Sequence, residues 1–295
     1  ALARGCPELI LLLRRWRLEH FAAPAWGPLL RRHRGRWDEA LRRAGDGPRI
    51  LVATSLGALV VATRMESLLS AALTLRGARV TVLLCDEALP ACQESLFSWF
   101  RSPGDLARQG QARLCRGCFG PACRMFRSLG LEVVTYGQFL PEPVREEIRQ
   151  QVARIPAAAL RDHREQGLAV GEQAWAGTLR YFSRGTLVGE PDAEPVLRKY
   201  LEAALRTARA AEGLLRERDF SCAVLHHGIY VPQGVIGEVC RRREVRIVTW
   251  NTAYRERCFI FSHGDTYHRT LLQEPVSAWE DYPWSERLDR RLAAY

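Results

Sequence analysis

Four cysteines lie close together in one stretch of the chain, at a spacing typical of metal ligands. They are Cys92, Cys115, Cys118 and Cys123, and they read Cys…Cys-x2-Cys-x4-Cys. A Cys-x2-Cys turn brings two thiolates to one ion, and two further thiolates complete a tetrahedral Zn²⁺ site or hold a [4Fe–4S] cluster. We therefore predict a cysteine-rich metal-binding loop, in which Cys85 can take the place of Cys92. Ordinary buried thiols or a disulfide are the alternative interpretation.

A second set of side chains capable of chemistry is built on histidine. Four of the seven histidines lie in two short segments, H-H-G-I-Y from His226 and S-H-G-D-T-Y-H from Ser262. Histidine titrates near neutral pH and suits removal of a proton from a hydroxyl, and a carboxylate can orient it or act as the base itself. The predicted catalytic residues are His227, His263 and Asp265. The predicted substrate-binding residues are Gly57, His226, Tyr230, Asn251, Tyr254, Arg255, Tyr267 and His268.

Other interpretations of these segments remain open. Any single histidine fits equally well as a buried, hydrogen-bonded side chain. A hydrolase metal held by His263, Asp265 and His268 has no H-E-x-x-H spacing behind it, and no G-x-S-x-G elbow is present. The turn at Ser55 has one glycine, Gly57, so it matches neither the dinucleotide fingerprint nor a P-loop, although the helix that follows can face an anion.

The elements that must position these residues follow an α/β pattern. Five short β-rich runs are separated by helical patterns: Arg49–Thr54, Val80–Leu84, Glu132–Tyr136, Cys222–Leu225 and Arg246–Thr249. This order predicts a Rossmann-like, mainly parallel sheet, with a large helical insertion over about residues 143–218. Ligands of such sheets bind at the carboxyl ends of the strands, so the loops that follow four of the strands are expected to share one rim.

The amino-terminal segment and the composition indicate where the protein works and which partners it has. Residues 1–47 read as amphipathic helices that either touch a membrane surface through Trp16, Phe21 and Trp26 or pack on the sheet. The formal charge is +10, but the arginines are scattered, so no nucleic acid is expected as a partner. Nine cysteines without a secretory signal favour a reducing compartment. We expect a cytoplasmic protein, peripheral at the inner membrane.

Several motifs carry a resemblance to a known family. They are R-I-L-V-A-T-S-L-G, R-G-A-R-V-T-V-L-L-C-D, H-G-I-Y-V-P-Q-G and F-S-H-G-D-T-Y-H, closed by Glu274, Pro275 and Trp279. Over most of residues 48–295 the chain resembles the amino-terminal half of bacterial capsular or surface-polysaccharide glycosyltransferases of the GT-B type. The cysteine cluster departs from the general GT-B pattern.

The resemblance implies an acceptor-binding, Rossmann-like domain that supplies the base for transfer of a sugar from a nucleotide-sugar to a growing glycan. The donor site would lie in a carboxyl-terminal domain beyond Tyr295, so we expect the chain to be a piece of a longer protein. The alternative, from a different class, is a noncatalytic scaffold domain organised by a zinc or iron–sulfur centre.

Overall fold

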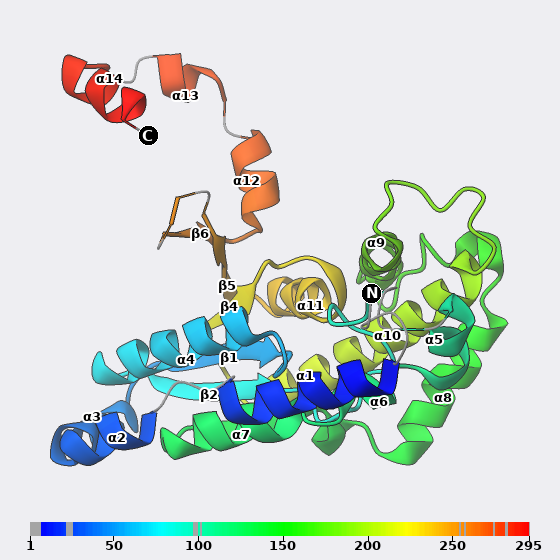
Figure 1. Cartoon of the computed structure of the whole chain (residues 1–295), viewed down its shortest axis with the longest axis horizontal. Helices are drawn as coiled ribbons and strands as arrows, with labels where there is room; N and C mark the ends of the chain where they lie inside the picture. Colours follow the sequence, from blue (N-terminus) through cyan, green and yellow to red (C-terminus); the bar gives the residue numbers. More distant parts are fainter. Residues whose placement is uncertain are drawn as a thin grey trace.

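A six-stranded sheet, mostly parallel, forms the centre of the molecule (Figure 1). The computed structural model describes residues 7–21, 26–96, 100, 102–253, 255–256, 258–273, 275–280 and 283–294. The strands are β1 (Arg49–Ser55), β2 (Arg79–Leu84), β3 (Glu132–Thr135), β4 (Cys222–His226), β5 (Arg246–Thr252) and β6 (Phe259–His263). Their order is β3-β2-β1-β4-β5-β6, and every neighbouring pair is parallel except β5 and β6. The prediction of an α/β fold with a mainly parallel sheet is confirmed; strand β6 was not predicted.

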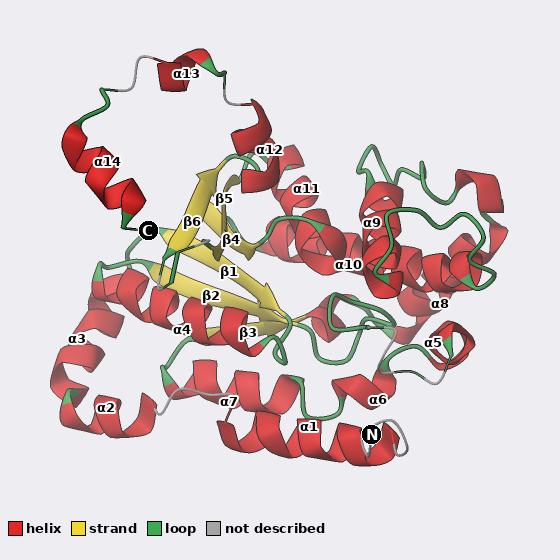
Figure 2. Ribbon diagram, turned by 45° about the horizontal axis from the view of Figure 1, so that its top comes forward, coloured by secondary structure: helices red, strands yellow, loops and turns green. Residues whose placement is uncertain are grey.

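Helices cover both faces of the sheet (Figure 2), so the strands are buried on both sides. In β1, Leu51 and Ala53 pack into one hydrophobic cluster and Val52 into another, as the alternation of side chains along a strand requires. Near-continuous apolar runs are typical of parallel strands buried on both sides. The core is therefore split by the sheet into two layers.

One layer is built by helices near the amino terminus and after β2. These are α1 (Pro7–Phe21), α2 (Trp26–Arg32), α3 (Arg34–Ala44), α4 (Val60–Leu75), α6 (Ala112–Cys115) and α7 (Phe119–Ser128). Helix α5 (Pro103–Gln109) belongs to the other layer, because its Leu106 packs in the cluster that contains Leu51. Helices α3, α4 and α7 contribute Trp37, Ala62 and Phe126 to the cluster that contains Val52. Among the described residues, no helix is long and apolar enough to cross a membrane.

The other layer contains the helical part of the chain between β3 and β4 and the helix that follows. It comprises the 3₁₀ turns Tyr136–Phe139 and Ala157–Ala159, α8 (Glu142–Arg154), α9 (Val170–Phe182), α10 (Ala193–Glu217), the π-type turn Tyr230–Gly234 and α11 (Val235–Arg242). Helix α10 is the longest, at 25 residues. Its buried residues, among them Leu201 and Leu205, belong to the cluster that contains Leu51 and Leu83 of the strands. The helical region thus covers the sheet.

Three short helices follow β6: α12 (Tyr267–Gln273), α13 (Ser277–Glu280) and α14 (Glu286–Ala293). In Figure 1, α13 and α14 extend away from the sheet. None of the side chains described in α14 is buried. Only the segment from Gly264 to Thr270, at the start of this region, takes part in the site described next.

Candidate functional site

The order of the strands reverses between β1 and β4, and polar side chains gather beside that point. From this point β1, β2 and β3 follow one another toward one edge of the sheet, and β4, β5 and β6 follow one another toward the other edge. The crevice at the carboxyl ends of β1 and β4 is therefore the expected position of a ligand in such a sheet. The turn after β4, residues 226–233, lies there and is called the histidine turn below.

The histidine turn has an unusual backbone. His227, Gly228 and Tyr230 have φ values of +60°, +73° and +66°. For residues other than glycine this left-handed conformation costs roughly 1–2 kcal/mol, and such positions are found disproportionately at functional sites. Gly228 is required by its surroundings as well, because a Cβ atom there would lie 2.6 Å from Cγ2 of Thr249. The backbone of His227 and Tyr230 is therefore strained, and the packing around the turn keeps it in this conformation.

The side chain of Asn251 determines the tautomer of His227. Its Oδ1 accepts a hydrogen bond from the backbone N–H of Thr252 at 2.8 Å, which leaves Nδ2 facing the site. That nitrogen lies 3.2 Å from Nδ1 of His227 and 3.1 Å from the hydroxyl of Tyr267. An amide nitrogen only donates, so Nδ1 of His227 accepts, and a neutral ring must carry its proton on Nε2. His227 consequently offers a hydrogen-bond donor, Nε2–H.

The imidazoles of the site are uncharged at neutral pH. Burial is the main reason that the pKa of His227 is lowered to about 4, and a proton on His268 and the charge of Arg180 add to the effect. Burial and the neighbouring His227 lower the pKa of His226 to about 3, and burial also lowers the pKa of His268. The rings of His227 and His268 stack with centroids 5.9 Å apart and planes 9° apart, and those of His226 and His227 lie 4.1 Å apart.

Several buried polar atoms around the histidine turn have no hydrogen-bond partner among the described residues. They are Nδ1 of His226, Nε2 of His268, both amide atoms of Gln233 and Oε1 of Gln93. Gln93 reaches this place because its backbone N–H donates to the carbonyl of Val231 at 3.1 Å. A buried polar atom left unpaired costs roughly 1–3 kcal/mol, so several around one turn indicate a place that a polar ligand completes.

The sequence analysis did not predict some residues of this site. Arg180 of α9 lies with its guanidinium 5.8 Å from the centre of the Tyr230 ring and also bonds the carbonyl of Gln93. It comes from a helix remote in sequence, and no motif marks it. Gln93 and Gln233 are likewise ordinary polar residues whose importance depends on burial. Two surface hollows, of about 630 and 590 Å³, lie over the helical region and are lined by none of these residues.

The structure brings together six of the predicted site residues: His226, His227, Tyr230, Asn251, Tyr267 and His268. His263 is not among them. It is exposed at the end of β6, opposite Val248 near the amino end of β5, because β6 runs antiparallel to its neighbour. His263, predicted to be catalytic together with His227, is therefore not placed beside it, and His268 stacks on His227 instead.

Asp265 has structural partners. Its carboxylate accepts from the N–H of Thr266 at 2.7 Å and pairs with Arg241 at 3.4 Å and Arg269 at 3.5 Å. Both cations engage its oxygens, which does not suit a free base. The neighbouring Thr266 hydroxyl donates to the carbonyl of His227 at 2.7 Å, so this loop holds the histidine turn in place.

Three further predicted residues lie elsewhere. Arg255 is exposed in the loop between β5 and β6, and Tyr254 lies outside the described residues. Gly57 serves a close backbone approach, because a Cβ there would lie 2.4 Å from the carbonyl oxygen of Cys118. Its loop therefore packs against the cysteine segment and leaves no room for a ligand at that atom.

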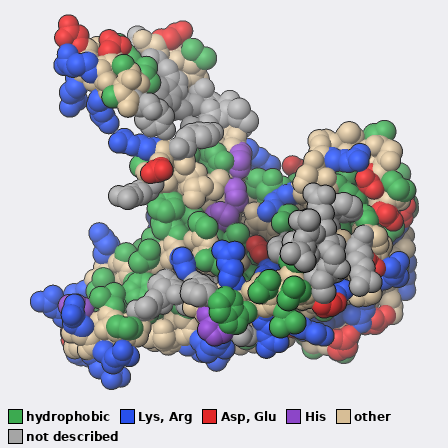
Figure 3. All heavy atoms as spheres, in the orientation of Figure 1, with side chains coloured by type: hydrophobic (Ala, Val, Ile, Leu, Met, Phe, Trp, Pro, Cys, Tyr) green, Lys and Arg blue, Asp and Glu red, His purple; other side chains and the backbone are tan. Residues whose placement is uncertain are grey.

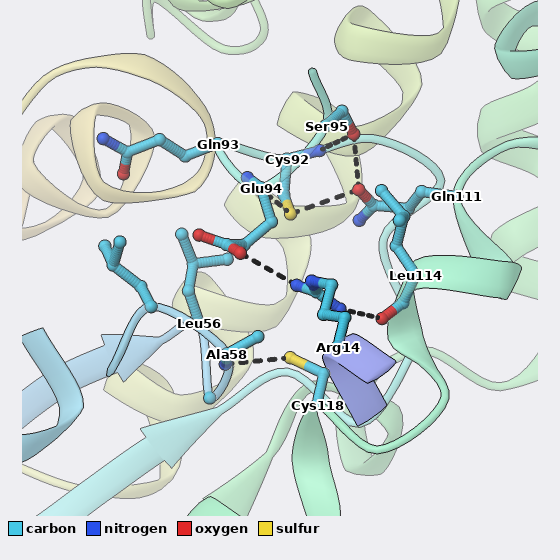
Figure 4. A network of polar contacts seen from close by, with 12 residues as sticks. Arg14, Leu56, Ala58, Cys92, Gln93, Glu94, Ser95, Gln111, Leu114 and Cys118 are labelled. Atoms are coloured by element: carbon cyan, nitrogen blue, oxygen red, sulfur yellow. Dashed lines mark hydrogen bonds and ion pairs between the residues drawn. The ribbon is translucent and has the colours of Figure 1, made fainter. Parts of the chain in front are cut away.

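The cysteines are divided by the structure. Cys85, Cys92, Cys115 and Cys118 occupy the loops beyond β2, whereas Cys123 packs with Phe126 in the hydrophobic layer under α7. All five are free thiols. Within the described part of the chain, no three His, Cys, Asp or Glu side chains converge in a metal-holding group. Figure 4 shows Cys92 and Cys118 on either side of the Arg14 and Glu94 side chains.

Comparisons with known proteins add no assignment: no protein-family model, curated protein or solved structure matches the chain. The fold and the site define an α/β protein with a Rossmann-like sheet and a polar site at its strand-order reversal.

Proposed function

We propose that this chain is the acceptor-binding half of a GT-B type glycosyltransferase, which passes a sugar from a nucleotide-sugar to a surface polysaccharide or other glycan. The observation that carries the proposal is the group of unpaired, buried polar atoms around the histidine turn, at the carboxyl edge of the sheet. Sugars carry many hydroxyls, and each hydroxyl can donate a hydrogen bond to, or accept one from, unpaired polar atoms of this kind. The motif resemblance over residues 48–295 supports the same class.

The chemistry of the site assigns different roles to its two stacked imidazoles. Because Nε2 of His227 carries the proton, this ring suits holding an oxygen of the acceptor or of a phosphate, and it lacks the lone pair that a base needs there. The base in this proposal is His268, whose Nε2 has no partner among the described residues. Tyr230 and Arg180 add a hydroxyl and a cation, and Arg180 suits the phosphate of a nucleotide-sugar.

Transfer of a labelled sugar by the full-length protein tests the proposal. A panel of labelled nucleotide-sugars is incubated with the protein and a glycan fraction, and label in the polymer is measured. Removing one positioned donor costs roughly 100-fold or more in rate, so we expect that loss from His227→Ala. Glutamine can still donate at this position, so H227Q should keep most of the activity. A base cannot be replaced in this way, so His268→Gln should be as inactive as His268→Ala.

The exposed His263 provides a matched control, since His263→Ala removes an imidazole outside the site and should leave transfer unchanged. Melting temperatures of all variants separate lost chemistry from lost folding. No transfer from any nucleotide-sugar by the wild type, or wild-type transfer by both alanine variants of the site, would refute the proposal. Equal loss in H227A and H227Q would return the role of base to His227.

A noncatalytic scaffold organised by a metal centre is the second candidate. It is supported by the position of Cys85, Cys92, Cys115 and Cys118 in the loops and helix end that follow β2. A protein that binds metal and a partner but transfers no sugar would belong to this class.

A further inference from the structure

A hollow of about 590 Å³ lies beside α9, and none of the residues of the histidine turn line it. Its walls are residues 161–164, one face of α9 and Thr186 in the loop that follows α9. The α9 residues are Glu172, Trp175 and Leu179, which lie on one face because they repeat at helical spacing. Figure 2 shows α9 at the surface of the helical region, with loops beside it. This volume is in the range of ligand pockets, and we call the hollow the α9 hollow.

Close backbone contacts hold the walls of the α9 hollow in place. The N–H of Gly171, in the first turn of α9, donates to the carbonyl of His163 at 3.0 Å. A Cβ atom at Gly171 would lie 2.5 Å from the carbonyl oxygens of Leu160 and Arg161, so only glycine permits this approach. The segment 161–164 is therefore fixed against α9, and the hollow is formed before a ligand enters, which lowers the cost of binding.

Trp175 gives the α9 hollow a flat apolar surface. Its side chain is partly buried and packs against the cluster that contains Leu51. The central carbon of the Arg161 guanidinium lies 5.4 Å from the centre of the indole ring, and Arg161 is exposed and also lines the hollow. One face of the ring is therefore turned toward the hollow. A sugar ring has an apolar face made of C–H groups, which can pack on an indole while the hydroxyls at its edge remain free to bond.

The polar side chains of the α9 hollow suit a neutral ligand with many hydroxyls. Four charged side chains line it, two of each sign: Arg161, Asp162, Arg164 and Glu172. Their formal charges cancel, so the hollow does not select an anion. Carboxylates accept hydrogen bonds from hydroxyls, and guanidinium groups donate to them. The imidazole of His163 also lines the hollow, and its Nε2 is buried without a partner among the described residues, so a ligand hydroxyl would satisfy it.

Glu172 places the α9 hollow next to the site of the proposed function. Besides lining the hollow, its carboxylate pairs with Arg269 at 3.7 Å. Arg269 directly follows His268, the base in the proposed reaction. Helix α9 also carries Arg180, whose guanidinium lies over the ring of Tyr230 in the histidine turn. The hollow and the histidine turn therefore border the same helix, and a chain of sugars that reacts at His268 can continue past Arg269 into the hollow.

We propose that the α9 hollow binds sugars of the glycan acceptor that lie behind the reacting hydroxyl. The inference rests on the proposed function, and it adds that the acceptor is a chain of sugars rather than a single sugar. The hollow takes no part in bond making. It holds the acceptor, and binding energy from such remote parts of a substrate positions the reacting group.

Binding of oligosaccharides to the whole chain tests the inference without any sugar transfer. An array of bacterial surface oligosaccharides identifies the sequences that bind, and calorimetry measures the affinity for members of different length, from single sugars to longer chains. We expect affinity to rise with chain length. Trp175→Ala should weaken binding of the longer chains by about 10-fold, as for an aromatic side chain at the centre of a binding site, and leave that of single sugars unchanged.

Three further variants identify the cause of a loss. Trp175→Phe retains an aromatic face and should keep most of the binding. Asp162→Ala removes an exposed carboxylate of the hollow that makes no ion pair among the described residues, so it should weaken binding several-fold and leave the melting temperature unchanged. Trp284→Ala is the matched control, because Trp284 is exposed near the carboxyl end of the chain and does not line the hollow. If Trp175→Ala fails to fold, Asp162→Ala decides.

Acceptors of different length separate this inference from the proposed function. With a functional transferase, Trp175→Ala should raise KM for long acceptors and leave kcat, and KM for short acceptors, unchanged. Length-dependent binding that W175A abolishes, without transfer from any nucleotide-sugar, would support the hollow as a glycan site and refute the transferase. Transfer to long acceptors with an unchanged KM in W175A, or affinity that does not rise with length, would overturn the inference.

Discussion

A single amide, that of Asn251, decides which nitrogen of His227 can act. Its Oδ1 is occupied by Thr252, so only its NH₂ group is left for the imidazole. The same amide also donates to Tyr267, which ties the two segments of the site together. The role of His227 thus depends on a neighbour that has no acid–base chemistry of its own.

Asn251→Asp should reverse this arrangement. A carboxylate only accepts, so Nδ1 of His227 must carry a proton, and the nearby negative charge should raise its pKa from about 4. Long-range proton–nitrogen NMR spectra of the imidazoles report both properties. We expect the Nε2–H tautomer in the wild type and the Nδ1–H or doubly protonated form in the variant. A wild-type ring protonated on Nδ1 would contradict the assignment.

Glu66 is a second residue whose protonation has a measurable consequence. It lies fully buried on α4 and accepts a hydrogen bond from Nε1 of Trp250 at 3.0 Å. Burial raises its pKa from 4.5 to about 7. The folded state therefore holds a proton that the unfolded chain releases above pH 4.5, so the contribution of Glu66 to stability falls as pH rises through about 7.

Glu66→Gln should remove this dependence, because the amide can still accept from Trp250 but does not titrate. Denaturant unfolding of both proteins between pH 4 and pH 9 measures it. The wild type should lose up to about 3 kcal/mol relative to the variant as pH rises across this range. Parallel curves for the two proteins would show that burial does not raise the pKa of Glu66 above that of the unfolded chain.

At the scale of elements, helix α1 has an apolar face turned to solvent. Leu9, Leu12, Leu13 and Trp16 follow the spacing of one helical face, and their exposed fractions run from 51% to 66%. Hydrophobic side chains gather over α1 in Figure 3, with arginines around them. Exposed Arg15 and Arg17 flank the face, which matches the charge of anionic lipid headgroups.

We expect α1 to bind vesicles that contain anionic lipid. Replacing Leu12 and Leu13 by Gln removes apolar area from this face and should weaken co-sedimentation several-fold, because interfacial binding scales with buried apolar area. Val188→Gln is the matched control, since Val188 is 84% exposed on the helical region. Equal binding of the wild type and the double variant, or binding to neutral vesicles alone, would contradict a role of α1 at membranes.

The sequence predicted best the strands that are buried on both faces of the sheet. Strands β1, β2, β4 and β5 are near-continuous apolar runs, and their ends located His226 and His227. Strand β6 carries a short apolar run, Phe259–Phe261, but it lies half exposed at the edge of the sheet, and it was not predicted. That omission also misplaced His263, since an antiparallel strand points its end the other way.

Side chains contributed by remote elements could not be found in this manner. Arg180 reaches the site from α9, and Gln93 from the loop after β2. Their positions depend on how α9 and that loop pack, which no local spacing encodes. The same limit applies to the cysteines, where Cys85 and Cys123 differ in environment only after folding.

For the whole molecule, the position of α10 restricts how the protein can be divided. The helical region looks like an insertion along the chain, yet α10 shares one core with the strands and also packs against α5, α8, α9 and α11. Deleting residues 143–218 would strip one face of the sheet, so a minimal fragment cannot be made by trimming there. Limited proteolysis should nick surface loops while the pieces stay associated, as one cooperative unfolding unit.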